Sequence, residues 1–360
     1  MQSVEETAAV ECNMKLSGLL DRNTLQLRPI LGILRRRTVK GDIGVNRRLA
    51  VIMDPIESIQ PQKDSTLAML LQAQSRGWTI HYGQLSDIWL RDGEAYGHLT
   101  QLNVADDPAH WFDPGEVSVA PLGDIDVILM RNDPPFDMNY IFATYVLQRA
   151  EEHGALVVNR PQGLRDANEK AILAWFPTCA PPTLISCSLD EMHAFITEHH
   201  KVVVKPLDLM GGQSVFVTDA NDGNHNVILE TVSGKGSRYV MVQKYLPEIT
   251  ESGDKRILLI DGQPVPMVLA RIPCAGDHRG NMVVGARTEV RSLTDRDRWI
   301  CDQIGPVLRD RGLLFAGIDV IGDFMTEVNV TSPTGIRELE RTSDLRISEQ
   351  IFDAISSKLE

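Results

Sequence analysis

Cysteine is scarce in this sequence, and the way it is used excludes several kinds of protein. The five cysteines are Cys12, Cys179, Cys187, Cys274 and Cys301. An odd number of cysteines without a CxxC pair argues against a disulfide framework and against a zinc site. The pattern is typical of reduced thiols, so we expect a cytoplasmic protein. Only Cys274, which lies in a predicted loop, is left as a candidate nucleophile.

Long apolar runs, an excess of basic residues and the common nucleotide-binding fingerprints are also missing. No run approaches the roughly 20 apolar residues that a membrane span needs. The formal net charge of −13 argues against a general nucleic-acid or membrane-surface binder. The absence of a Walker A sequence and of GxGxxG weakens a P-loop or Rossmann interpretation. What is present is a chain of 360 residues, 43% of them apolar, which suits two or three domains with buried cores.

The first 48 residues differ in charge from the rest of the chain. They hold nine Lys or Arg and five Asp or Glu, a net charge of +4, which leaves −17 on the remaining residues. No apolar segment follows their basic residues, and Glu5, Glu6 and Glu11 come early, which argues against a secretory or transit peptide. We expect residues 1–48 to be a poorly ordered extension.

Short apolar strands and amphipathic helices alternate after this extension. Such alternation predicts a doubly wound α/β domain, here over residues 49–166. The predicted strands are 49–53, 79–82, 125–130 and 155–159, and the predicted helices are 65–76 and 138–153.

A second block, residues 167–360, has a different pattern that predicts an α+β domain with mostly antiparallel strands. Asp261-Gly262 is a strong hairpin signal within it. Its predicted helices are 167–176 and 189–199, and its predicted strands include 201–205, 214–217, 239–246, 255–260, 317–321 and 325–329.

A lysine followed by a glycine turn is the first candidate for chemistry. In the segment 205–214, Gly211 and Gly212 let backbone N–H groups approach a phosphate, and Lys205 supplies a positive charge. The alternative is a plain hairpin turn between two strands.

Two carboxylates and an amide on neighbouring strands are the second candidate. Glu327 and Asn329 are two residues apart and therefore share one face of a strand. A three-residue loop at 322–324 would place Asp319 opposite Glu327, whereas a strict two-residue turn would place them on opposite faces. Such hard oxygen ligands suit Mg²⁺ that also bridges substrate phosphates. The alternative is an exposed polar face.

Arginines beside apolar strands and a long glycine-containing loop complete the candidates. Arg131, Arg256 and Arg271 would be costly in those positions unless they meet anions, such as carboxylates or phosphates. Each arginine taken singly also suits a structural ion pair. The polar loop about 273–288 is suited to a mobile lid that excludes water, or to an ordinary surface connection.

An ordered series of segments runs from about residue 49 to the C-terminus: Val51–Pro55, Lys63–Ser65, Asp126–Arg131, Asp133–Asp137, Asn168–Lys170, Lys205–Asp208, Met210–Gly212, Asp254–Arg256, Leu269–Pro273 and Glu327–Thr334. In their order and spacing these segments resemble bacterial glutathione synthetase, an ATP-grasp ligase. The resemblance implies an N-terminal preATP-grasp substrate domain followed by an ATP-grasp domain.

The resemblance also implies roles for individual residues. It assigns the nucleotide to Lys170, Lys205, Met210, Gly211, Gly212, Gln213, Ser214 and Gln243. It assigns Mg²⁺ or Mn²⁺ to Asp319, Glu327 and Asn329, and stabilisation of an acyl phosphate to Arg256 and Arg271. The substrates are assigned to Arg131, Ser332, Thr334 and Arg287.

The implied activity is ATP-dependent ligation of γ-glutamylcysteine to glycine through an acyl phosphate, in a homo-oligomer, commonly a tetramer. The sequence departs from the family pattern at Ala286 and Thr288, where the lid typically has glycines, and at Asn132, where a lysine is usual. Two other hypotheses stay open. One is an ATP-grasp ligase with a different dipeptide or acceptor, and the other is a non-catalytic nucleotide-binding regulator.

Overall fold

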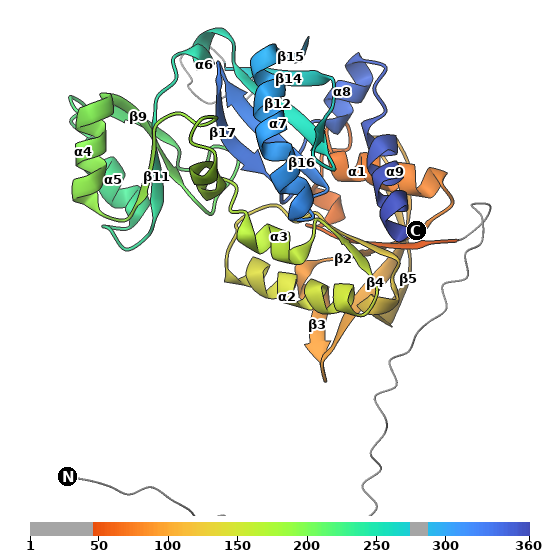
Figure 1. Cartoon of the computed structure of the whole chain (residues 1–360). Coiled ribbons are helices and arrows are strands. Elements are labelled where there is room, and N and C mark those ends of the chain that lie inside the picture. The colour runs from red at the N-terminus through yellow and green to blue at the C-terminus, as the bar shows by residue number, and fades with distance from the viewer. Residues whose placement is uncertain (1–45, 274–286) are drawn as a thin grey trace, which may run out of the picture. The chain divides into compact units, whose positions relative to one another are not determined.

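The computed structural model describes residues 46–273 and 287–360, whose strands form three sheets (Figure 1). Nearly all of the predicted extension 1–48 and most of the predicted lid 273–288 lie outside the described residues, so both stay predictions. Among the described helices, none combines the length and the apolar character that crossing a membrane would require.

The first sheet has the strand order β3-β4-β2-β1-β6-β7, with β5 paired to β4. Strands β2, β1, β6 and β7 run parallel, as the alternating pattern predicted, whereas β3, β4 and β5 are antiparallel additions that it missed. The strands are β1 (Arg48–Ile52), β2 (Thr79–Gly83), β3 (Ile88–Arg91), β4 (Glu94–Val104), β5 (Phe112–Pro121), β6 (Val127–Met130) and β7 (Leu156–Val158).

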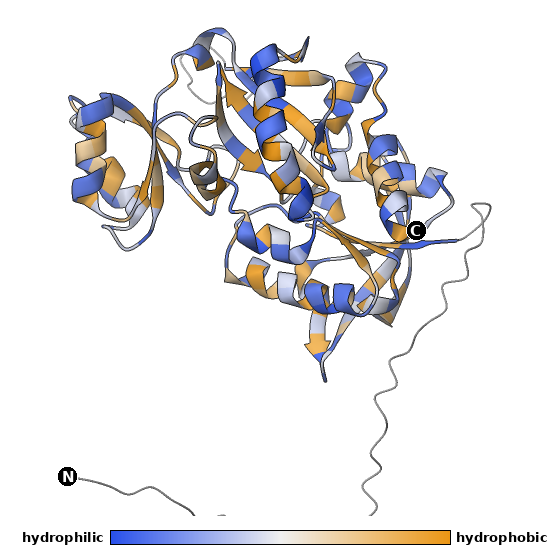
Figure 2. Ribbon diagram, viewed as in Figure 1, coloured by the Kyte–Doolittle hydropathy of each residue, from blue (hydrophilic) through white to orange (hydrophobic). Residues whose placement is uncertain are grey.

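Helices α1 (Ser65–Ser75) and α2 (Met138–Glu152) cover opposite faces of this sheet. Val51 of β1 belongs to the same core cluster as Leu67 of α1, and the next residue, Ile52, belongs to the cluster of Leu147 of α2. Because successive strand residues point to opposite faces, the two helices lie on the two sides, which confirms the doubly wound arrangement. Figure 2 shows the apolar residues concentrated on the strands between these helices.

The predicted helix 167–176 is wrong. The chain instead forms α3 (Pro161–Asp166), with proline at its first turn, and then a 3₁₀ helix, Ala171–Trp175. Between them the Asn168 side-chain oxygen accepts hydrogen bonds from the backbone N–H groups of Lys170 (3.2 Å) and Ala171 (2.9 Å). Such a local turn competes with the α-helix for the same backbone donors, so the helical pattern does not start until it has passed.

The second sheet is antiparallel and has the order β10-β9-β11-β8. Helices α4 (Leu189–His199) and α5 (His225–Ser233) pack against it around Met192, Ile196 and Leu229. The strands are β8 (Thr183–Ser186), β9 (Lys201–Pro206), β10 (Phe216–Asp219) and β11 (Val240–Lys244).

The third sheet is also antiparallel and has the order β15-β14-β12-β16-β17, with the short β13 on β12. The predicted Asp261-Gly262 hairpin forms between β12 and β13. The strands are β12 (Asp254–Ile260), β13 (Gln263–Pro264), β14 (Met267–Ile272), β15 (Arg287–Ser292), β16 (Phe315–Ile321) and β17 (Phe324–Asn329). The accompanying helices are α6 (Glu248–Glu251), α7 (Asp295–Asp310), α8 (Ile336–Thr342) and α9 (Ile347–Leu359).

The contact between α7 and the β12–β13 turn generates a stability prediction. A Cβ atom on Gly305 of α7 would lie 2.2 Å from the carbonyl oxygen of Gly262. Replacing a helical glycine by alanine ordinarily stabilises a helix by about 1 kcal/mol. Here we expect Gly305→Ala to lower the free energy of unfolding by roughly 1–3 kcal/mol, because the helix and the turn must move apart.

Urea denaturation of the Gly305→Ala variant measures this effect. Gly223→Ala is the matched control, because a Cβ on Gly223 meets no atom within 4 Å and its φ is not positive. Equal or greater stability of Gly305→Ala would contradict the close packing of α7 on the turn.

Candidate functional site

A cleft of about 360 Å³ lies between the second and third sheets. Its size is in the range of small-molecule sites. Val203 of β9 lines one side of the cleft and Ile321 of β16 lines the other. Most of the predicted site residues meet here, namely Lys170, Lys205, Met210, Gly211, Gly212, Gln213, Gln243, Arg256, Arg271, Asp319, Glu327 and Asn329.

The glycine turn forms one wall of this cleft. Gly211 and Gly212 have φ values of +69° and +73°, in the left-handed region that side chains rarely adopt. The turn closes with a hydrogen bond from the Gln213 N–H to the Met210 carbonyl oxygen (3.1 Å). It joins the antiparallel strands β9 and β10, so it is a hairpin connection that also lines the cleft.

Lys205 is aimed by a chain of polar side chains from the second sheet. Its Nζ donates to the Gln243 Oε1 atom (2.9 Å), and the Gln243 Nε2 atom donates to the Thr183 hydroxyl (3.0 Å). Strands β9, β11 and β8 are neighbours, which brings the three residues together. Burial lowers the pKa of Lys205, and Glu327 offsets part of that effect.

Asp319 stands between two buried arginines on the opposite wall. Arg256 reaches its two oxygens at 2.5 and 3.0 Å, and Arg271 reaches Oδ2 at 2.9 Å. A Cβ on Gly317 would lie 2.8 Å from Arg256 Cδ, so the glycine leaves room for Arg256 to cross β16. Burial raises the pKa of Asp319, but the two guanidiniums outweigh burial, so its pKa lies below the ordinary range.

A bulge in the pairing of β16 and β17, which the sequence did not predict, places Asp319 opposite Glu327. The strands are joined by a two-residue turn, with Ile321 paired to Phe324. A bulge then shifts the register, so that Thr326 is the extra residue and Asp319 pairs with Glu327. A three-residue loop was expected to bring the two carboxylates to the same face of the strands. The bulge has this effect instead, and both carboxylates line the cleft.

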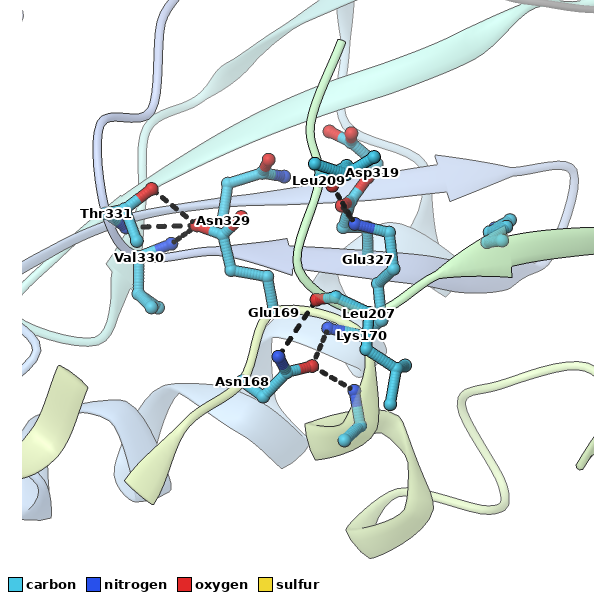
Figure 3. A network of polar contacts seen from close by, with 12 residues as sticks. Asn168, Glu169, Lys170, Leu207, Leu209, Asp319, Glu327, Asn329, Val330 and Thr331 are labelled. Carbon is cyan, nitrogen blue, oxygen red and sulfur yellow. Dashed lines mark hydrogen bonds and ion pairs between the residues drawn. The ribbon is translucent and has the colours of Figure 1, made fainter. Parts of the chain in front are cut away.

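Lys170 connects the glycine-loop side of the cleft to β17 (Figure 3). Its Nζ donates to the Leu209 carbonyl oxygen (2.7 Å) and pairs with Glu327 Oε1 (2.8 Å). Burial lowers the pKa of Lys170, but the carboxylates of Glu327, Glu169 and Asp319 together outweigh burial, so its pKa is raised.

The donor set on the third sheet fits a hard divalent cation. Asp319 and Glu327 supply carboxylate oxygens, and Lys170 takes only one oxygen of Glu327. Asn329 donates its Nδ2 to the Gly317 carbonyl oxygen (3.2 Å), which leaves its amide oxygen for another partner. Carboxylate and amide oxygens are the ligands that Mg²⁺ and related ions prefer. Histidine and cysteine do not contribute, and among the described residues no group of three or more His, Cys, Asp or Glu is arranged so that these side chains alone could hold a metal ion.

The predicted substrate residues lie outside the lining of this cleft. Arg131 is buried and donates to the Thr66 hydroxyl (3.1 Å) and the Pro333 carbonyl oxygen (2.9 Å). The Thr334 carbonyl oxygen accepts from Arg256 (3.3 Å), so the segment 332–334 runs beside the arginines. Arg287 is exposed on β15 and pairs with Glu289 (2.7 Å).

Ser214, predicted to belong to the nucleotide loop, follows Gln213 with a φ of +54° and does not line the cleft. Sequence reasoning also missed two carboxylates. Asp254 pairs with Arg271 across β12 and β14, in a register that only the sheet order reveals. Glu169 is buried beside Lys170 and bonds to the segment that follows β17. Its position between Asn168 and Lys170, in a segment singled out for its resemblance, was the available signal.

Comparisons with known proteins agree on one family. A sequence model described as prokaryotic glutathione synthetase, N-terminal domain, matches residues 48–165, and one described as prokaryotic glutathione synthetase, ATP-grasp domain, matches residues 169–344. The chain is 53% identical over 312 residues to a protein from Pseudomonas putida named glutathione synthetase, covering 87% of this chain and 98% of that protein. It is 50% identical over 313 residues to the one from Escherichia coli K12, covering 87% and 99%.

Solved structures share the fold at much lower identity. D-cycloserine synthetase matches with a TM-score of 0.62 at 14% identity, covering 87% of this chain and 100% of that chain. D-alanyl-alanine synthetase A from Vibrio cholerae matches with a TM-score of 0.56 at 13% identity, covering 88% and 99%. These two likenesses support the predicted ATP-grasp fold.

The charge on Asp319 has a measurable consequence for stability. Asp319→Asn leaves two buried guanidiniums without their shared anion, so we expect the free energy of unfolding at pH 7 to fall by about 3–5 kcal/mol. Because the folded-state pKa is lowered, this contribution is present above the unfolded-state value of about 4 and is lost as the pH falls below it.

Urea denaturation between pH 7 and pH 3 tests both statements. The loss of stability below pH 4 should be shallower in Asp319→Asn than in the wild type. A variant as stable as the wild type at pH 7 would contradict the paired arrangement.

Proposed function

Because the chain belongs to the prokaryotic glutathione synthetase family, we propose that its cleft binds ATP and that the adjoining 332–334 segment helps to bind the dipeptide that is activated there. The chain is an ATP-dependent carbon–nitrogen ligase of glutathione synthesis. The single observation that carries the residue assignments is the convergence of Lys170, Lys205, Arg256 and Arg271 on one cleft with the donor set of Asp319, Glu327 and Asn329.

We infer that the nucleotide lies between the second and third sheets. Val203, Leu246 and Ile321 give the cleft apolar surface from both sides, which suits the flat faces of a purine. Lys205 and Lys170 are placed to contact the phosphates. The N–H groups of Gly211 and Gly212, in the glycine turn that lines the cleft, would hold the terminal phosphate. Gln243 orients Lys205 and acts on the nucleotide through it.

The divalent cation that such ligases use would be held by Asp319, Glu327 and Asn329, and Mg²⁺ is the ion that these oxygens suit best, with Mn²⁺ as the alternative. When bound, it would neutralise charge on the triphosphate during transfer. The residues of the chain supply the rest. Lys170, paired with Glu327, would hold the phosphates close to the carboxylates, and Asp319 keeps Arg256 and Arg271 aimed into the cleft.

The reaction requires that the substrates be held in position and that negative charge be stabilised in the transition state. An oxygen of the cysteinyl carboxylate attacks the γ-phosphorus of ATP and ADP leaves. The glycine amine then attacks the acyl carbon, loses a proton and expels phosphate. Arg256 and Arg271 are placed to stabilise the acyl phosphate and the tetrahedral intermediate, in a site where fixed charges act more strongly than in water. No protein nucleophile is needed.

The substrates would enter from the side of the first sheet. Arg131 bonds to the Pro333 carbonyl oxygen and Arg256 to the Thr334 carbonyl oxygen, which holds the segment 332–334 beside the arginines. We propose that Ser332 and Thr334 bind substrate carboxylates there. We propose that Arg287 contacts the substrates together with the predicted lid, about residues 273–288. We further propose a division between substrate and ATP-grasp domains near residue 166, and a homo-oligomer, commonly a tetramer in this family.

Substrate dependence is the decisive test of the proposed function. We expect phosphate release from ATP to require both γ-glutamylcysteine and glycine, because the acyl phosphate forms on one and is consumed by the other. A coupled ADP assay with each substrate omitted in turn measures this. Release with another dipeptide or amine, and none with this pair, would overturn the assignment.

Removal of a metal ligand is the second test. We expect Glu327→Ala to lower kcat at least about 10²-fold, because the loss of a charged ligand removes several kcal/mol of transition-state stabilisation. Glu151→Ala is the matched control, since Glu151 pairs with Arg160 (3.5 Å) and does not line the cleft. Unchanged activity in Glu327→Ala would remove Glu327 from the metal site.

A further inference from the structure

Three consecutive residues, Asn168 to Lys170, tie the segment before the glycine turn to β17 and to the segment that follows β17 (Figure 3). The Asn168 Nδ2 atom donates to the Leu207 carbonyl oxygen (2.9 Å), just before the glycine turn. Lys170 binds the Leu209 carbonyl oxygen and Glu327, as described above. Glu169, between them, turns the other way and reaches the segment that follows β17.

Glu169 takes the place of a neighbouring strand along the outer edge of β17. In the described part of the chain, β17 is the last strand of its sheet, so its outer N–H groups need other partners. The Glu169 carbonyl oxygen accepts from the Val328 N–H (2.8 Å). Its Oε1 atom then accepts from the Val330 N–H (2.8 Å), the Thr331 N–H (3.0 Å) and the Thr331 hydroxyl (2.9 Å).

These bonds hold β17 on both sides of Asn329. Val328 and Val330 are fully buried and flank it in the sequence, whereas Asn329 points to the cleft. The same bonds fix the point where the chain leaves β17 and enters the substrate segment 332–334. Glu169 itself is 7% exposed and does not line the cleft, so it can act on the reaction only through its partners.

We propose that Glu169 is a positioning residue that fixes the metal-ligating end of β17 and the start of the substrate segment through its capacity to accept three hydrogen bonds. The inference rests on the proposed function of Asn329 and of residues 332–334. It assigns the effect to the reach and acceptor geometry of Oε1 and not to the negative charge, because all three of its donors are neutral groups.

Two substitutions of Glu169 separate the effect of its side-chain length from the effect of its negative charge. Glu169→Gln keeps the length and an acceptor oxygen but removes the charge, whereas Glu169→Asp keeps the charge but withdraws the oxygens by about 1.5 Å. We expect Glu169→Gln to stay within about threefold of the wild-type kcat. We expect Glu169→Asp to lose about 10- to 100-fold, in line with the loss of buried hydrogen bonds.

The expected signature in Glu169→Asp is a shift in metal dependence. Titration calorimetry of ADP at increasing Mg²⁺ should show the half-saturating Mg²⁺ concentration rising about tenfold, while ADP affinity in EDTA changes less than about twofold, because the glycine turn and Lys205 are untouched. The KM for γ-glutamylcysteine should rise with it. Thr331→Val, which removes only the hydroxyl bond, should show the same shift at a smaller size and serves as the second variant.

Glu340→Ala is the matched control for a structural effect. The Glu340 Oε1 atom accepts from the Ser348 N–H and hydroxyl (both 2.8 Å), a similar set of bonds between α8 and α9 away from the cleft. This variant should lose thermal stability without moving the Mg²⁺ dependence. The proposal is overturned if Glu169→Asp behaves like Glu340→Ala, or if Glu169→Gln is as defective as Glu169→Asp. A wild-type protein that binds ADP without any effect of Mg²⁺ would instead overturn the proposed function, and this inference with it.

Discussion

The shared ion pair of Asp319 with Arg256 and Arg271 is the interaction on which the cleft depends. Two guanidiniums in the interior would be too costly without an anion, and Asp319 meets both. The pair also aims the arginines, since each is held from β12 or β14 toward β16. Asp319 therefore both stabilises the fold, by neutralising the buried arginines, and holds them in the orientation proposed for the reaction.

The chain is acidic overall, yet its substrates are anions. A local concentration of positive charge in the cleft explains how it can bind them. The net charge of −13 describes the whole sequence, but five cationic side chains line the cleft. Four of them come from the two facing sheets (Lys205, Lys244, Arg256 and Arg271), and Lys170 comes from the irregular segment beside them. Asp254, Asp319 and Glu327 hold three of these cations, Arg256, Arg271 and Lys170, in place. Lys205 is held by the neutral Gln243, and among the described residues it forms no ion pair with a carboxylate. Binding of a triphosphate adds anions to a site whose geometry is already set.

Much of the fold and most of the cleft could be predicted from the sequence, because period-2 and period-3.6 patterns and glycine turns are local signals. The cleft residues from Lys170 to Asn329 were named that way or by resemblance. Two features were not local. The bulge at Thr326 sets the facing of Asp319 and Glu327, and the Asp254–Arg271 pair depends on sheet order. Each is decided by a contact that the chain makes only after it has folded. The Asn168 turn is local, but its side-chain hydrogen bonds replace the helix that the pattern over 167–176 predicted.

The segment Asn168–Lys170 has a consequence for how this chain tolerates change in length. It lies in irregular backbone between α3 and a 3₁₀ helix, the kind of connection in which insertions and deletions are usually accepted. Here each successive side chain is committed to a different partner, so adding or removing one residue would move all three out of register together. This loop is therefore expected to tolerate a change in length poorly.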